Sequence, residues 1–353
     1  MKATAPKSLK IDGRTIGPGE PPYLIAELSG NHNGQIERAF ELIQHAKNAG
    51  ADAVKIQTYT ADTITIESDR PEFRISGGLW DGRTLYELYK EAHTPWEWHE
   101  ALFDKAREVG ITMFSSPFDA TAVDLLANLG APAYKIASFE LLDLPLIQKA
   151  AEQGRPLIMS TGLANLGEIG DAIDAAREAG CDDLAVLHCV SAYPAPANES
   201  NVRTIPHLAE AFGTPVGLSD HTLGTAVAVA AVAMGACVIE KHVCLRRADG
   251  GPDAGFSLEP HEFKQLVQDC RDASEALGRP HYDLKGSERG AVVFRRSLYA
   301  VADIAPGERF TAENVRSIRP GNGLPPKELP NLLGKVARCK VPRGTPLDWS
   351  FVD

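Results

Sequence analysis

The 353-residue sequence lacks three features that would each indicate a particular class of protein. It has no run of about 18 apolar residues, and its first residues, MKATAPKSLK, contain no apolar stretch of the kind found in signal peptides. It also has no excess of positive charge, because 36 Lys and Arg residues stand against 47 Asp and Glu residues, for a net charge of −11. These absences exclude a membrane span, a secretory signal and the basic footprint of a nucleic-acid-binding protein. We expect a cytoplasmic protein that holds any anionic ligand by local positive charge.

Cysteine is scarce and irregularly spaced. The six cysteines form no CxxC pair, so the sequence indicates neither a disulfide framework nor a zinc-binding motif. Reduced thiols that pack in the interior are expected in a reducing compartment. These residues are Cys181, Cys189, Cys237, Cys244, Cys270 and Cys339.

Short β-type runs alternate with amphipathic helical stretches along most of the chain. Such alternation predicts βαβ units and a parallel sheet. Eight units within about 250 residues, with no GxGxxG after the first strand, favour a closed barrel over a doubly wound sheet. The predicted fold is therefore α/β, with a (β/α)8 TIM barrel at residues 23–278. The predicted strands are 23–28, 53–58, 111–116, 133–138, 156–161, 184–190, 215–220 and 236–243.

Four segments lie outside the regular repeat. Residues 1–22 are predicted to form a hairpin or lid, 279–290 a linker, and 291–353 a small β-rich domain with strands near 295–303, 315–318 and 336–341. The segment 62–94 is too long for an ordinary strand-to-helix connection, and loops of that size are usually functional or disordered. Its aromatic residues favour an ordered lid over the barrel mouth.

Two lysines and four serines converge on the predicted carboxyl ends of the strands, where such barrels build their active sites. Lys55 and Lys135 lie at matching depths, and a buried lysine needs a partner. One interpretation is a structural salt bridge inside the barrel. The other is a cradle for a phosphate or carboxylate, in which two cations act with hydroxyl groups. The serines are Ser116, Ser138, Ser160 and Ser219.

Two histidines end the last two predicted strands, which are neighbours in a closed barrel. His221 and His242 are therefore expected to face each other, either as hydrogen-bonded rim residues or as metal ligands. With Glu27 and Asp253 nearby, the mixed imidazole and carboxylate set suits Mn²⁺, Mg²⁺, Fe²⁺ or Zn²⁺. His188 is interpreted as a residue that lines the pocket.

Aromatic and basic residues outside these strands leave alternatives open. Trp80, Trp96 and Trp98 provide either a sugar-stacking surface or the packing of a lid, and packing is favoured for those at helix spacing. The adjacent Arg295 and Arg296 are either both solvated, or one of them projects into a partner's active site across a dimer.

Eight motifs in sequence order resemble those of the nonulosonic (sialic-type) acid synthases. Enzymes of this family condense phosphoenolpyruvate with an N-acetylated sugar aldehyde. The tail FRRSL…DIAPGE…ENVRSIRPGNGLPP resembles the antifreeze-like (SAF) domain of that family. Within the family, residues 77–100 with CVIEKHV and DGGPD are most similar to the synthases of pseudaminic acid, which use 2,4-diacetamido-2,4,6-trideoxy-L-altrose. The eight motifs are IAELSGNHNG, ADAVKIQT, SSPFD, YKIAS, STG, HCVSAYPAP, GLSDHT and EKH.

The resemblance implies roles for individual residues and a carbon–carbon bond-forming transferase of carbohydrate biosynthesis. Catalytic roles are implied for Glu27, Lys55, Glu140, His221 and His242, with Glu27 orienting the attacking water. Phosphoenolpyruvate binding is implied for Lys55, Ser116, Lys135, Ser138, Ser160, Ser191 and Ser219. Sugar binding is implied for Gln57, Glu140, Tyr193, Asp253 and Arg296. The implied cofactor is a divalent metal ion, Mn²⁺ or Mg²⁺, on His221 and His242. The implied partner is a second copy, in a domain-swapped homodimer whose Arg296 reaches the neighbouring site.

Three positions depart from the sialic acid synthases. Those enzymes tend to have Asn at the position of Ser191, and Gly at the positions of Ala137 and Phe139. The added apolar bulk of Phe139 suits a 6-deoxy sugar, which presents a methyl group. An N-acetylneuraminate or legionaminate synthase is the first alternative. A class I aldolase with a Schiff base on Lys55 or Lys135, and a non-enzymatic carbohydrate- or ice-binding module, are further alternatives.

Overall fold

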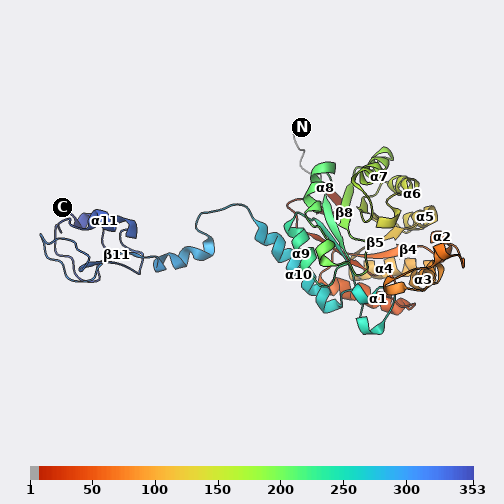
Figure 1. The fold of residues 1–353 in the computed structure, drawn as a ribbon, viewed down its shortest axis with the longest axis horizontal. Helices are drawn as coiled ribbons and strands as arrows, with labels where there is room; N and C mark the ends of the chain where they lie inside the picture. Colours follow the sequence, from red (N-terminus) through yellow and green to blue (C-terminus); the bar gives the residue numbers. More distant parts are fainter. Residues whose placement is uncertain (1–7) are drawn as a thin grey trace. The chain divides into compact units, whose positions relative to one another are not determined.

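The computed structural model describes residues 8–353, and the chain divides into two compact units, of which the second is Arg279–Asp353 (Figure 1). Of the predicted N-terminal segment 1–22, residues 1–7 lie outside the described part. None of the helices in residues 8–353 combines the length and the apolar character that a membrane crossing requires.

The first unit is a closed barrel of eight parallel strands, as predicted. The strands follow one another in sequence order around the barrel, and β10 pairs with β3 to close it. Each predicted strand is confirmed, the second with its predicted bounds and the others with ends that differ by at most two residues. The strands are β3 (Tyr23–Glu27), β4 (Ala53–Thr58), β5 (Thr112–Pro117), β6 (Tyr134–Ile136), β7 (Leu157–Ser160), β8 (Leu184–Cys189), β9 (Val216–Asp220) and β10 (Val238–His242).

Helices connect the strands and surround the barrel (Figure 1). Gly50 and Gly110 each end a helix in a left-handed conformation, with φ of 90° and 71°, which costs other residues energy. Asp119, Asp143 and Asn165 cap three others at the amino end. The helices are α1 (Ile36–Ala49), α4 (His99–Val109), α5 (Ala120–Asn128), α6 (Leu144–Ala151), α7 (Leu166–Glu178), α8 (Thr204–Phe212), α9 (Ala226–Ala233) and α10 (Pro260–Leu277).

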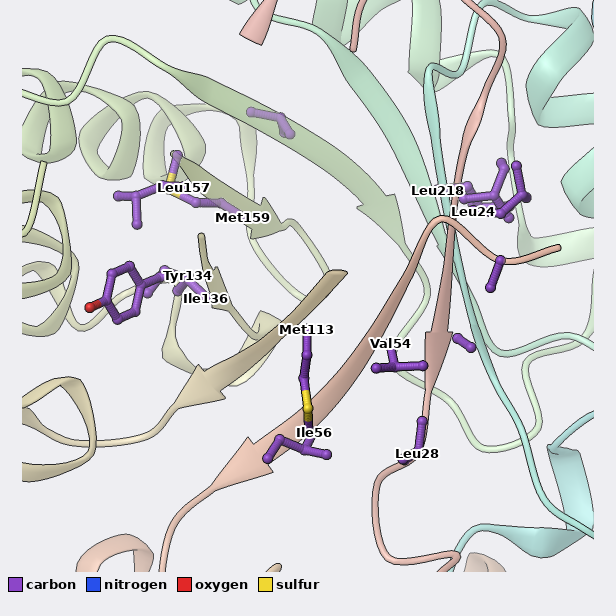
Figure 2. Close-up of a cluster of buried hydrophobic side chains, with 14 of the residues drawn as sticks. Leu24, Leu28, Val54, Ile56, Met113, Tyr134, Ile136, Leu157, Met159 and Leu218 are labelled. Carbon is purple, nitrogen blue, oxygen red and sulfur yellow. The ribbon is translucent and has the colours of Figure 1, made fainter. Parts of the chain in front are cut away.

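Alternate residues of each strand belong to two different layers. One set, including Leu24, Val54 and Met113, packs between the strands and the surrounding helices (Figure 2). The other set points into the barrel, where Ile25 and Phe114 form a separate apolar cluster near the amino ends of the strands. The period of two therefore decides which polar side chains near the carboxyl ends face the interior.

The N-terminal hairpin closes the amino end of the barrel. Its strands, β1 (Leu9–Ile11) and β2 (Arg14–Ile16), pair antiparallel and place their apolar residues in the interior cluster. Arg14 forms an ion pair with Asp52, directly before β4. The predicted hairpin is present in the described part of this segment, and it covers the end of the barrel opposite the carboxyl ends of the strands.

The period of two also corrects the prediction for His188. This residue lies on the helix-facing side of β8, and its Nε2 is 2.6 Å from the carbonyl oxygen of Ser200. It therefore does not line the barrel interior. Lys241 lies on the same side of β10, where its Nζ is 2.7 Å from Asp220 Oδ2 in a buried ion pair.

The segment between β4 and α4 is folded. It contains α2 (Ala61–Ile64), α3 (Leu85–Ala92) and 3₁₀ turns at Pro71–Phe73, Gly78–Trp80 and Trp96–Trp98. A capping box starts α3, since the Thr84 hydroxyl accepts from Glu87 N and the Glu87 carboxylate accepts from Thr84 N. The prediction of an ordered segment agrees with this.

The second unit is small and has little regular structure. A 3₁₀ helix at Gly286–Phe294 crosses the predicted border between linker and domain, and β11 (Ser297–Ala300) pairs antiparallel with β12 (Val315–Ile318). A short α11 (Leu329–Leu332) follows. The predicted strand 336–341 is wrong, because only single bridges form there. The core of the second unit contains Leu298, Ile304, Phe310, Val341 and Leu347.

Candidate active site

Two lysines and two glutamates form a buried ion-pair network inside the barrel. Lys55 Nζ lies 2.7 Å from Glu27 Oε2 and 3.5 Å from Glu240 Oε1. Lys135 Nζ lies 3.2 Å from the same oxygen of Glu240. All four side chains come from the interior-facing positions of β3, β4, β6 and β10. The lysines therefore form salt bridges inside the barrel, as the first interpretation predicts. The same network also brings both ammonium groups to one oxygen of Glu240.

The buried network shifts the pKa values of Glu27, Glu240 and Lys135. Burial raises the pKa of Glu27, and the Lys55 ammonium only partly offsets this. Burial would also raise the pKa of Glu240, but the nearby Lys135 and Lys55 outweigh it and lower that pKa. Burial lowers the pKa of Lys135 despite the attraction of Glu240. Glu240 is therefore the carboxylate that both lysines share, and Glu27 is the one that most readily holds a proton.

The predicted serines lie around this network. Ser116 Oγ accepts a hydrogen bond of 3.0 Å from Lys55 Nζ, and Ser219 Oγ donates one of 3.4 Å to Glu240 Oε1. Ser160 Oγ is buried and has no hydrogen-bond partner among residues 8–353. A bound anion would satisfy the hydrogen-bonding capacity of this hydroxyl.

Ser138 and Ser191 meet above Gly162. Ser138 Oγ accepts a 3.1 Å hydrogen bond from Gly162 N. A Cβ atom on Gly162 would lie 2.8 Å from Ser138 Oγ and would collide with Ser191 Oγ. Glycine is required here because the backbone approaches both hydroxyls closely. The backbone and two hydroxyls thus form a small polar cradle.

The two predicted histidines face each other, with ring centroids 5.4 Å apart. His221 Nδ1 donates a 3.1 Å hydrogen bond to the Val190 carbonyl, so in the neutral ring Nε2 carries the free lone pair. Although burial lowers the pKa of His221, its contacts with Cys189 and Val190 outweigh burial and raise it. His242 Nδ1 is buried, and no residue in the described part of the chain forms a hydrogen bond with it. Burial, with the neighbouring His221, lowers the pKa of His242 far below its ordinary value, so the ring is neutral and able to bind a cation.

The ring nitrogens of His221 and His242 form a pair of donors of the kind that binds a divalent cation. In residues 8–353 no group of three or more His, Cys, Asp or Glu side chains is arranged to hold a metal ion. Asp253 Oδ2, expected as a nearby carboxylate, lies 3.8 Å from His242 Nδ1 and accepts a hydrogen bond from Ser29 Oγ. Gln57 Nε2 donates to Ser29 Oγ (3.1 Å) and to Glu27 Oε1 (2.9 Å), which links this side of the site to the ion-pair network.

Aromatic rings surround the histidine pair. The ring of Tyr193 lies 4.5 Å from His221 and 5.3 Å from Phe256, and Trp80 lies 5.5 Å from Tyr193. Phe256 also packs 4.9 Å from His242. Burial raises the pKa of Tyr193 strongly, so its hydroxyl stays protonated.

Glu140 lies in the 3₁₀ turn after β6, next to Ser138. Its Oε2 is buried and has no hydrogen-bond partner within the described chain, and burial raises the pKa of the carboxyl to about 7. A carboxyl group that changes charge near neutral pH can exchange a proton with a bound substrate.

Arg296 is the one predicted site residue in the second unit. It lies directly before β11, and its Nη1 donates a 3.2 Å hydrogen bond to the Ser317 carbonyl.

Three residues of the site were missed or misread in the sequence. Glu240 shares the inward face of β10 with His242, as their spacing of two predicts, but the sequence indicated no role for it. Cys189 was interpreted as packing, yet its Sγ lies 3.7 Å from His221 Nδ1 and 3.6 Å from Ser191 Oγ. Asn31 donates to the Val243 carbonyl (2.8 Å) and to Ser257 Oγ (2.9 Å), contacts more than 200 residues away in sequence, which no local pattern reveals.

Known proteins share both the barrel and the tail. The family model described as "NeuB family" matches residues 42–282, and that of the SAF domain matches residues 295–353. The chain is 46% identical to a pseudaminic acid synthase of Campylobacter jejuni over 93% of this chain and 96% of the relative. It is 43% identical to a pseudaminic acid synthase of Helicobacter pylori over 95% of this chain and 98% of the relative. The crystal structure of an N-acetylneuraminic acid synthetase from Leptospira borgpetersenii matches with a TM-score of 0.72 and 29% identity, and the match covers 81% of this chain and 95% of that one.

Proposed function

The chain belongs to the NeuB family, and from this premise we propose that it is a pseudaminic acid synthase, which joins phosphoenolpyruvate to 2,4-diacetamido-2,4,6-trideoxy-L-altrose. Water is the third reactant, and pseudaminic acid and inorganic phosphate are the products. The observation that carries this proposal is the 46% identity to a pseudaminic acid synthase, which extends over 93% of the chain. The matched N-acetylneuraminic acid synthetase is less similar, at 29% identity.

The lysine and serine side of the site suits the anionic reactant. Phosphoenolpyruvate carries a phosphate and a carboxylate, and Lys55 and Lys135 are two ammonium groups within reach of one carboxylate oxygen of Glu240. Ammonium and hydroxyl donors form strong, charge-assisted hydrogen bonds with such anions. The unpartnered Ser160 hydroxyl and the cradle at Gly162 supply further donors. The proposed binding set is Lys55, Ser116, Lys135, Ser138, Ser160, Ser191 and Ser219.

The histidine side of the site suits the sugar. His221 and His242 would hold a divalent cation, Mn²⁺ or Mg²⁺, which when bound supplies Lewis-acid polarisation of the aldehyde oxygen. The residues proposed to bind and orient the sugar around this pair are Gln57, Glu140, Tyr193 and Asp253. Because Glu140 has a pKa of about 7, it can hold or give up a proton beside the sugar at neutral pH.

Glu27 is the proposed residue for the water. C3 of phosphoenolpyruvate forms the new bond to the aldehyde carbon as the π bond of the aldehyde opens, and the aldehyde oxygen takes up a proton to become a hydroxyl group. Water captures the positive charge that develops at C2. Glu27 accepts hydrogen bonds from Gln57 and is paired with Lys55, and burial raises its pKa, so as a carboxylate it readily takes the proton that water releases. Collapse of the resulting tetrahedral centre at C2 breaks the C–O bond to phosphate. The interior position of Glu27 on β3 brings this base next to the lysines that hold the anion.

A homodimer is part of the proposal. Three large apolar side chains that follow β6, β7 and β9 are exposed in the single chain: Phe139 (58%), Leu163 (76%) and Leu223 (65%). Apolar residues grouped at the mouth of a barrel are typical of a surface that another chain covers. We infer that a second copy covers them and that its Arg296 supplies a positive charge to the sugar.

Mixed dimers test this inference. Arg296→Ala and His242→Ala are each expected to be inactive alone. Co-refolded dimers of the two variants should regain activity, because the barrel that keeps His242 receives Arg296 from the other chain. Absence of activity in dimers shown by mass to contain one copy of each variant would contradict the exchange.

One assay tests the function and its alternatives. Purified protein is incubated with phosphoenolpyruvate, Mn²⁺ and, in separate reactions, the altrose derivative, its legionaminate-pathway counterpart and N-acetylmannosamine. Phosphate release and a product of pseudaminic acid mass with the altrose derivative alone support the proposal. Preference for another sugar would assign a different synthase. Trapping of an adduct on Lys55 or Lys135 by borohydride, without phosphate release, would indicate a class I aldolase instead.

A further inference from the structure

Trp80 anchors the long segment between β4 and α4 to a loop on another part of the barrel. Its indole Nε1 donates a 2.9 Å hydrogen bond to the carbonyl oxygen of Pro252, in the loop after β10. The neighbouring Leu79 packs on the same loop, with side-chain atoms 3.9 Å from the position that a Cβ on Gly255 would occupy. Since β3 lies between β4 and β10 in the barrel, the segment passes the carboxyl end of β3 to reach this loop.

The indole ring also contacts the aromatic group beside the histidines. Its centroid lies 5.5 Å from that of Tyr193, with the two planes tilted by 46°. Tyr193 follows β8 and packs 4.5 Å from His221. Pro252 directly precedes Asp253, which lies 3.8 Å from His242. One side chain therefore bridges the two elements that flank the histidine pair, on the side of the site proposed for the sugar.

The indole ring of Trp80 presents an apolar surface at this position. The hydrogen bond to Pro252 uses the only polar atom of the indole, so the half-buried ring offers its faces and edges alone. Aromatic faces pack favourably on C–H groups and give no partner to a hydroxyl group that loses water. Such a surface favours a sugar that presents methyl groups over one that presents hydroxyls.

On the basis of the proposed function, we propose that Trp80 determines specificity for the sugar by packing against a methyl-bearing substituent of 2,4-diacetamido-2,4,6-trideoxy-L-altrose. That sugar has a C6 methyl group and a second acetamido group, whereas N-acetylmannosamine has hydroxyl-bearing groups at both positions. An apolar contact of this kind discriminates by about tenfold to about two-hundredfold. Trp80 is a specificity-determining residue in this scheme, and the anion side of the site is independent of it.

Steady-state kinetics on three variants test the proposal. Trp80→Ala should lower kcat/KM for the altrose derivative by about tenfold to about a hundredfold, leave KM for phosphoenolpyruvate within about twofold, and reduce the preference over N-acetylmannosamine. Trp80→Phe keeps an aromatic face but loses the bond to Pro252, and it should stay within about threefold of the parent. Leu79→Ala, which alters the adjacent contact with the same loop, is the matched control and should leave the sugar preference unchanged.

Several results would overturn the proposal. An unchanged KM for the sugar in Trp80→Ala would show that Trp80 does not contact the sugar. Equal losses in Trp80→Phe and Trp80→Ala would assign the effect to the hydrogen bond that holds the loop. A parallel rise in both substrates' KM values would indicate a merely structural role. The parent enzyme is assayed first: if it releases no phosphate with any sugar, the proposed function and this inference fail together, whereas an active parent with an unaltered Trp80→Ala variant refutes this inference alone.

Discussion

Replacement of Glu140 by Gln should stabilise the protein at alkaline pH and leave its stability unchanged at acidic pH. Burial raises the pKa of this carboxyl from 4.5 to about 7 in the folded chain. Below pH 4.5 the group is protonated in both the folded and the unfolded chain, so burial of the carboxyl carries no ionisation cost. Between pH 4.5 and about 7 the unfolded chain loses the proton and the folded chain keeps it, so the stability of the wild type falls as the pH rises.

Above pH 7 the carboxyl is ionised in both states, and the full cost is present. The difference between 4.5 and about 7 corresponds to about 3 kcal/mol. Gln is neutral at every pH and avoids this cost. The gain in stability of Glu140→Gln over the wild type should therefore be larger by up to about 3 kcal/mol at pH about 8.5 than at pH about 4.5. For a domain of this size that equals a difference of roughly 6 °C in the melting temperature.

Calorimetric melting of both proteins across this pH range measures the effect. Glu41→Gln, which removes one carboxylate from an exposed position in the middle of α1, is the matched control for the change in net charge. The reasoning is refuted if the melting temperatures of Glu140→Gln and the wild type differ by the same amount at both ends of the range. Because Glu140 is also proposed to contact the sugar, the more stable variant should be less active, as is common where a buried charge serves function.

Three further substitutions test other parts of the site. His242→Ala should abolish metal-dependent turnover and weaken Mn²⁺ binding measured by calorimetry, with unchanged circular dichroism; full activity of the variant in the presence of a chelator would contradict the role in metal binding. Lys135→Met removes one of the two cations on Glu240, and it should raise KM for phosphoenolpyruvate by about tenfold to a hundredfold and destabilise the barrel by about 3 to 5 kcal/mol, measured by phosphate release and thermal unfolding. Gly162→Ala places a methyl group against Ser191 Oγ, so KM for phosphoenolpyruvate should rise with little change in KM for the sugar. An unaltered KM for phosphoenolpyruvate in Lys135→Met or Gly162→Ala would show that phosphoenolpyruvate does not bind beside that residue.

The barrel could be predicted from the sequence because its signals are local. Each strand is a short apolar run, each helix has an amphipathic period, and glycines such as Gly50 and Gly110 end helices through their own backbone conformation. The same period of two places Glu240 and His242 on one face of β10. Applied to β8, it would also have placed His188 on the helix side, where the structure finds it.

The arrangement of the site depended on contacts that join distant parts of the chain. Lys135 and Glu240 are 105 residues apart, and Trp80 and Pro252 are 172 apart. The sequence indicated the family and its chemistry. It also indicated that two lysines and two histidines gather at the barrel mouth. Only the tertiary structure decided that both lysines share Glu240, that Cys189 lies beside His221 and that the N-terminal hairpin covers the opposite end. The physical reason is that periodicity and capping act within one element, whereas ion pairing, burial and the resulting pKa values arise only when the closed barrel removes these side chains from water.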